Sequence, residues 1–142
     1  MSYDLKLSKG DLVLNNSGEL KIVDKNSKIR QDILKILLTE IGENKYHKYY
    51  GSQAGSLSIG GIVDEDFHKS KIEQSIFSAL DNLISLQRNQ MRFQYLSPAE
   101  TILSISRVEA FRDLSDPRMW SVFVSVITLE QEELQESITI RI

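Results

Sequence analysis

The chain is organised around residues 26–51, which read NSKIRQDILKILLTEIGENKYHKYYG. Apolar residues recur there at helical spacing and predict one apolar helix face, made of Ile29, Ile33, Ile36, Leu37 and Ile41. Ser27 is the expected N-cap, because its hydroxyl can accept a hydrogen bond from a backbone N–H of the first turn. We expect Gly42 to end the helix, since glycine enters the left-handed conformation without a Cβ penalty.

An aromatic and basic segment follows this helix and ends at Gly51. Tyrosines bury ring area while their hydroxyls remain at the rim, and they are enriched at protein interfaces. Two interpretations stay open: the rings cover the core beneath the loop, or they bind a partner. The second interpretation assigns a partner interface to Tyr46, Lys48, Tyr49, Tyr50 and Gly51.

The residues before the helix have the pattern of short strands. Leu5 and Leu7 alternate with polar residues, and Leu20 and Ile22 resume the alternation after turn-forming residues 15–18. We expect a β-hairpin or a small meander that leads into the helix and covers one of its sides.

Residues 52–63 are rich in glycine and low in charge. They lack the lysine and the strand–glycine–helix context of a phosphate-binding loop. We interpret them as a connector, and Leu57, Ile59, Ile62 and Val63 make it a candidate docking segment.

A second helix is predicted from Asp64 to about Gln90. Acidic residues at its start suit the helix dipole. Its apolar residues then recur at helical spacing: Phe67, Ile72, Ile76, Leu80, Leu83 and Ile84. Residues 91–96 alternate, so we expect an extended segment before Pro98.

The last third of the chain predicts three antiparallel strands. The apolar phase slips near Ser106, which indicates a bulge in the first of them. Residues 120–129 are apolar on both faces, which is typical of a central strand. The final strand alternates and is expected at a sheet edge, where unpaired backbone groups can accept another chain. Its apolar residues, Leu134, Ile138 and Ile140, complete the predicted partner interface.

The order of elements indicates the α+β class. An N-terminal β-hairpin precedes two helices, and a C-terminal antiparallel β-meander follows them. The length of 142 residues suits one domain with a substantial core, and we assign residues 1–142 to a single domain.

Composition narrows the function classes. The net charge is −3 and the basic residues are dispersed, which argues against nucleic acid as a partner. Cysteine is absent, so no disulfide or thiolate metal site is expected. No apolar run approaches membrane length, and we expect no membrane partner and synthesis in the cytoplasm.

The sequence shows no motif for chemistry. His47 and His68 are the only histidines, and neither belongs to a metal-binding motif. Glu40 and Glu43 are the nearest approach to the paired carboxylates of a glycosidase, but nothing places them in a cleft. We therefore predict no catalytic, cofactor-binding or metal-binding residues, and no enzyme.

The central stretch and the order of elements resemble a known family. Leu37, Leu38, Thr39, Gly42, Glu43, Tyr50 and Gly51 match its helix end and its loop closed by a Tyr-Gly pair. The family is the small baseplate wedge protein of contractile-tailed phages, of GPW type, which has a counterpart in type VI secretion baseplates. The sequence departs from the family's Glu-Pro-Arg motif: Pro98 is present without those neighbours.

The resemblance implies a non-enzymatic structural component of a contractile tail baseplate. Its expected partners are other wedge proteins, the hub and tube proteins and the sheath protein, in several copies around a sixfold ring. The resemblance also implies a role in starting sheath polymerisation, with assembly in the host cytoplasm and a final place in the virion tail. Two alternatives stay open: a small hydrolase of cell-wall glycan and an unrelated cytosolic adaptor.

Overall fold

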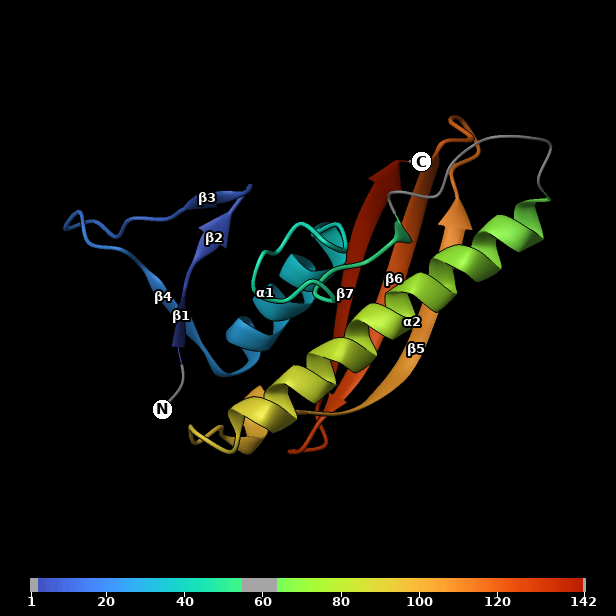
Figure 1. Cartoon of the computed structure of the whole chain (residues 1–142). Coiled ribbons are helices and arrows are strands. Elements are labelled where there is room, and N and C mark those ends of the chain that lie inside the picture. Colours follow the sequence, from blue (N-terminus) through green and yellow to red (C-terminus); the bar gives the residue numbers. More distant parts are fainter. Residues whose placement is uncertain (1–2, 55–63, 142) are drawn as a thin grey trace.

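The protein has the predicted α+β fold (Figure 1). The computed structural model describes residues 3–54 and 64–141. The apolar residues of the predicted docking segment 52–63, which are Leu57, Ile59, Ile62 and Val63, lie outside the described residues. The elements in chain order are β1 (Tyr3–Leu5), β2 (Leu7–Ser8), β3 (Asp11–Leu12), β4 (Ile22–Asp24), α1 (Lys25–Leu38), α2 (Glu65–Gln90), the short 3-10 helix η2 (Pro98–Glu100), β5 (Ile102–Arg112), β6 (Met119–Thr128) and β7 (Glu133–Arg141).

The C-terminal strands form an antiparallel sheet in the order β5-β6-β7. The strand that is apolar on both faces, β6, is central, as predicted. Val124 pairs with Val108 on one side and with Glu136 on the other. The register shifts between Ile105 and Arg107, which confirms the predicted bulge.

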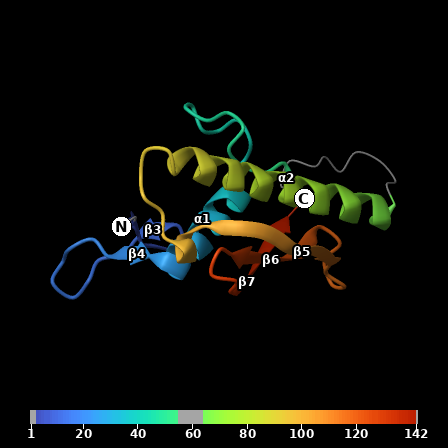
Figure 2. The ribbon, with the colours of Figure 1, turned by 90° about the horizontal axis from the view of Figure 1, so that it is seen from below.

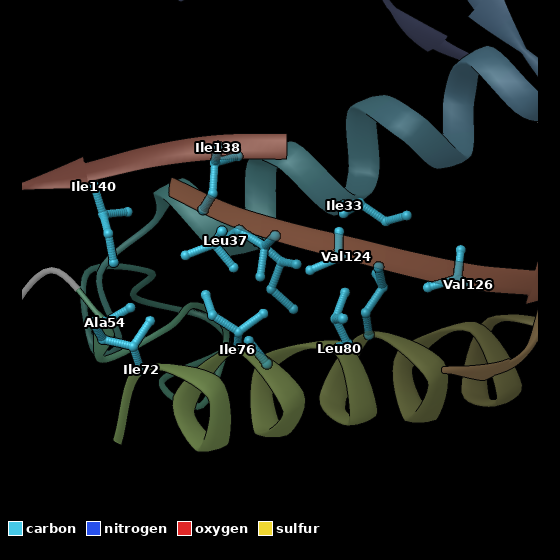
Figure 3. Packing of buried hydrophobic residues seen from close by; sticks show 14 of the residues in the cluster. Ile33, Leu37, Ala54, Ile72, Ile76, Leu80, Val124, Val126, Ile138 and Ile140 are labelled. Atoms are coloured by element: carbon cyan, nitrogen blue, oxygen red, sulfur yellow. The ribbon is translucent and has the colours of Figure 1, made fainter. Parts of the chain in front are cut away.

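Both helices pack on one face of this sheet (Figure 2). The inward residues of α1, α2, β6 and β7 share one cluster, in which Ile33, Ile76 and Val126 are fully buried (Figure 3). Burial of each such side chain contributes about 1.5–3 kcal/mol. Helix α2 also packs along β5, so the sheet and both helices stabilise each other.

The ends of α1 differ from the prediction. Asp24 occupies the N-cap position without a side-chain cap, and Ser27 lies inside the first turn. The helix ends at Leu38, four residues before Gly42. Thr39 leaves the helix because its carbonyl accepts the N–H of Ser52 at 2.8 Å, which draws the chain into a bridge with a distant residue. Ile41 therefore lies outside the helix and is 37% exposed.

Helix α2 has the predicted length, but the segment after it is not extended. Residues 91–94 continue in turns, in which the N–H of Gln94 binds the carbonyl of Gln90 at 2.9 Å. The chain then enters η2, where the Glu100 carboxylate accepts hydrogen bonds from Ser97. Phe67, predicted on the buried face of α2, is half exposed.

The N-terminal strands form a projecting arm, which we define as residues 3–24. Strand β1 pairs with β4 and β2 with β3, which confirms the predicted hairpin. Figure 1 shows that the arm extends away from the three-stranded sheet. It touches α1 near its base, where Gln31 Nε2 donates to Asp4 Oδ2 at 3.1 Å and Lys35 pairs with Asp4.

Candidate partner-binding site

The predicted interface residues of the loop lie in a compact segment, residues 40–52, which we call the aromatic loop. Asn44 sets its first turn, because its side-chain oxygen accepts the N–H groups of Tyr46 at 3.0 Å and His47 at 3.1 Å. Asparagine favours such turns by binding backbone groups two or three residues ahead. The N–H of Tyr50 then binds the carbonyl of His47 at 2.9 Å.

The two ends of the aromatic loop are held together by backbone contacts. Glu40 and Ser52 form a parallel bridge, and the Ser52 hydroxyl donates to the carbonyl of Leu37 at 2.9 Å. Gly51 has a φ of +126°, and a Cβ atom there would lie 2.6 Å from the Thr39 carbonyl oxygen. The Tyr-Gly pair thus closes the loop where only glycine fits.

The tyrosines have different environments. Tyr46 is 92% exposed and Tyr49 is 48% exposed, whereas Tyr50 is partly buried and packs against the core. Tyr49 Oη lies 3.3 Å from His47 Nδ1, and its carbonyl accepts a hydrogen bond from Asn82 of α2. Tyr46, Tyr49 and the exposed Lys48 therefore present groups to solvent, while Tyr50 and the buried Gly51 anchor the loop.

The phenol of Tyr50 lies near the charged side chains of Lys35, Asp32 and Asp4. Burial raises the pKa of Tyr50, Lys35 opposes that shift, and the carboxylates of Asp32 and Asp4 reinforce it. The phenol is therefore neutral at physiological pH. The position of Tyr50 beside these charged side chains supports a role in anchoring the aromatic loop rather than in catalysis.

The predicted interface residues of β7 point into the core. Leu134, Ile138 and Ile140 are 4–8% exposed, so their side chains are not available to a partner. They lie on the sheet face that the helices cover. What β7 presents at the edge of the sheet is its backbone.

The orientation of that backbone follows from one contact. Arg30 Nη1 donates to the carbonyl of Gln135 at 2.9 Å, so this carbonyl points away from β6. In an antiparallel strand the hydrogen-bonding direction alternates from residue to residue. Ser137 and Thr139 therefore direct their N–H and C=O groups to the same outer edge.

A hollow of about 320 Å³ lies beside this edge. Leu38, Thr39 and Glu40 line it on the α1 side, and Thr139 and Arg141 line it on the β7 side. Glu40 and Glu43, the carboxylates considered for catalysis, are exposed residues of the same hollow. The edge and the aromatic loop thus meet at one end of α1.

Helix α2 binds the opposite edge of the sheet near both ends of β5. Glu73 Oε1 accepts the N–H of Ala110 at 3.0 Å, and Gln87 Oε1 accepts the N–H of Ile102 at 2.9 Å. On β7, Arg30 of α1 binds the Gln135 carbonyl only. The two edges therefore differ in the second half of β7, where no side chain of another described element binds the outward backbone groups of Ser137 and Thr139.

Sequence reasoning did not single out Ser52, Ser137 or Thr139. The alternation of β7 showed which of its side chains are buried, but the residues whose backbone groups point outward are identified only by the contact of Arg30 with Gln135. Ser52 had no signal, since its bridge to Glu40 depends on where α1 ends.

Among residues 3–54 and 64–141, no cluster of three or more histidine, aspartate or glutamate side chains is arranged to hold a metal ion. Within the same residues, no helix combines the length and the apolar character needed to cross a membrane.

Comparison with known proteins adds two findings. Residues 1–86 match the family described as the contractile injection system sheath initiator. The fold is similar to the crystal structure of a proposed tail lysozyme from Geobacter sulfurreducens, with a TM-score of 0.61 and 13% sequence identity. That similarity covers 93% of this chain and 96% of the other. No curated protein matches the sequence.

Proposed function

This chain belongs to the contractile injection system sheath initiator family, and we propose that it is the baseplate subunit on which the contractile sheath begins to polymerise. The family is structural and implies contacts with sheath and other tail components. In finer detail, we propose a small wedge protein of GPW type, placed near the hub and tube in several copies around a sixfold ring. Residues 1–142 would act as one domain within the tail of a virion or of a related injection machine.

One observation carries this proposal: α2 binds backbone N–H groups near both ends of β5, whereas the second half of β7 borders a hollow. A strand from a neighbouring protein can extend a sheet at an edge, where main-chain hydrogen bonds supply affinity. Polar side chains of α2 bind β5 near both ends, whereas Ser137 and Thr139 direct backbone groups outward and Thr139 lines the 320 Å³ hollow. We infer that a sheath segment pairs with this half of β7.

The aromatic loop would form the second contact. Tyr46, Lys48 and Tyr49 lie at the end of α1 that also borders the hollow. An adjacent wedge or hub protein that packs on these rings would hold the open edge toward the sheath. Tyr50 and Gly51 would support the loop from beneath.

The name of the Geobacter sulfurreducens protein raises a glycan hydrolase as the second candidate. At 13% identity the similarity shows a shared fold and does not show a shared activity. Glu40 and Glu43 are exposed residues on a loop, not carboxylates in a site that excludes water. We therefore propose that the chain is not an enzyme.

The test is sheath assembly on purified baseplates that carry single substitutions. Thr139→Pro removes one outward N–H of β7 and is tolerated at a sheet edge, so the chain should fold while sheath growth is lost. Thr139→Val keeps the N–H and should support sheath growth at the wild-type level. Electron microscopy counts the sheathed tails. Normal sheath growth on a folded Thr139→Pro protein would reject the pairing of this edge.

A further inference from the structure

A second hollow, of about 690 Å³, lies between the arm and the outer side of α1. Apolar side chains line it from both elements: Leu7 and Val23 from the arm, and Leu34 and Leu38 from α1. Leu38 is 65% exposed and Leu7 is 37% exposed. Apart from the end of α1, none of these residues belongs to the surfaces proposed above for the sheath and its neighbours.

The charged groups around this hollow are all basic. Lys6, Lys9, Arg30 and Lys35 line it, and no carboxylate does. Arg30 is paired with Glu136, and Lys35 with Asp4 and Asp32. Within the described residues, Lys6 and Lys9 have no ion-pair partner. In a chain whose net charge is −3, this is a local excess of positive charge beside an apolar surface.

The position of Lys9 adds a second, independent observation. Lys9 has a φ of 53° and Gly10 a φ of 84°, so both residues of the turn between β2 and β3 are left-handed. Such two-residue hairpin turns favour asparagine, aspartate or glycine at their first position. A lysine here costs turn stability, and residues held at such a cost concentrate at functional sites.

The backbone of the arm indicates which kind of segment fits. Gln31 of α1 binds the arm on this side: its Oε1 accepts the N–H of Leu7 at 2.8 Å, and its Nε2 donates to the carbonyl of Leu5 at 2.7 Å. A strand added here would have to break these bonds. A helix would not, because it satisfies its own backbone groups.

We propose that this hollow binds an amphipathic helix of a partner protein. Its apolar side chains contact Leu7, Leu34 and Leu38, and its carboxylates meet Lys6 and Lys9. Leu38 and Thr39 border both this hollow and the one beside β7, whereas Leu7, Lys6 and Lys9 line this hollow and not the other. The proposal does not depend on what the β7 edge binds.

The test uses the purified chain and two designed helical peptides of about 18 residues, long enough to form helix in water. Both carry leucine at positions i, i+4 and i+7, flanked by glutamate in one peptide and by lysine in the other. We expect the glutamate peptide to bind roughly tenfold more tightly, because only its carboxylates can form ion pairs with Lys6 and Lys9 at the rim of the hollow. Methyl NMR shifts should map to Leu7, Leu34 and Leu38.

Lys6→Gln combined with Lys9→Asn should abolish the preference for the glutamate peptide. The thermal stability should not fall, because asparagine suits the left-handed position better than lysine does. Lys71→Gln with Arg118→Gln removes the same charge from exposed positions outside the proposed binding surfaces and should leave the preference intact.

Three results would overturn the inference. One is equal binding, or no binding, of the two peptides. Another is a preference for glutamate that survives the Lys6→Gln and Lys9→Asn changes. The third is a dimer of the chain that Leu38→Ser dissociates, because the occupant would then be a second copy.

Discussion

Gly51 is the residue on which closure of the aromatic loop depends. Its φ of +126° is strained for any other residue, and its Cα faces the Thr39 carbonyl and the Glu40 and Ile41 backbone. Gly42 shares a positive φ, at +91°, but a Cβ there would meet nothing within 4 Å. A substitution of Gly42 therefore adds conformational strain alone, whereas a substitution of Gly51 adds both strain and a steric clash.

We predict that Gly51→Ala destabilises the protein by about 2–4 kcal/mol, because strain adds to a backbone clash. Gly42→Ala carries the strain alone and should cost about 1 kcal/mol. Urea denaturation followed by circular dichroism measures both values. Equal losses for the two variants would show that the contact with Thr39 is relieved by a small shift of the loop.

At the scale of elements, the arm is joined to α1 by a small polar network. Burial alone would raise the pKa of Asp4. Its contacts with Lys35, the N–H of Leu5 and Gln31 outweigh that effect and lower the pKa below the ordinary 3.8. The carboxylate is therefore bound more favourably in the folded arm than in the unfolded chain. This favours the docked arm whenever the carboxylate is charged.

The sign of the resulting pH dependence follows from linkage. A lowered carboxylate pKa contributes stability that is present above about pH 4 and is lost as the pH falls through the folded value. We predict that the amide of Leu7, bound to Gln31, loses hydrogen-exchange protection as the pH falls below about 4. In the Asp4→Asn variant, the hydrogen-exchange protection of the Leu7 amide, measured relative to amides of α1, should already be weak at neutral pH. It should not change as the pH falls. If the protection of the wild-type Leu7 amide relative to α1 does not change with pH, the proposed link between the Asp4 carboxylate and docking of the arm is wrong.

At the scale of the whole molecule, the proposed function rests on the difference between the two edges of the sheet. Helix α2 occupies the β5 edge through Glu73 and Gln87, while α1 leaves the outer half of β7 beside a hollow. A sheet with one available edge can accept a neighbour without also forming unlimited edge-to-edge stacks. A sheath that starts from such a subunit would therefore extend from one side of it only.

A structural scaffold and a glycan hydrolase predict different roles for Glu40 and Glu43. We predict that the purified chain releases no fragments from peptidoglycan, because Glu40 and Glu43 are solvent-exposed. The double variant Glu40→Gln, Glu43→Gln should support sheath assembly to at least half the wild-type yield, since it leaves the β7 backbone unchanged. Measurable turnover that the double variant loses would instead identify an enzyme.

The candidate site was only partly predictable from sequence. Alternation identified β7 as an edge strand, and the tyrosine-rich loop was recognised as a candidate contact. Which rings face water was not predictable, because Tyr46 and Tyr50 lie in the same loop and differ only in what packs beneath them. The end of α1 was misplaced because a contact with Ser52, remote in sequence, outweighs the local signal of Gly42.

The α+β class, the central place of β6 and the order of hairpin, helices and meander could be predicted from the sequence, because they follow from local periodicity and turn residues. Packing sets which sheet edge α2 contacts, which tyrosines are exposed and where the arm leaves a basic, apolar hollow. Each of these depends on side chains from distant segments, such as Glu73 reaching Ala110 and Gln31 reaching Leu7. Such contacts exist only once the elements have packed together.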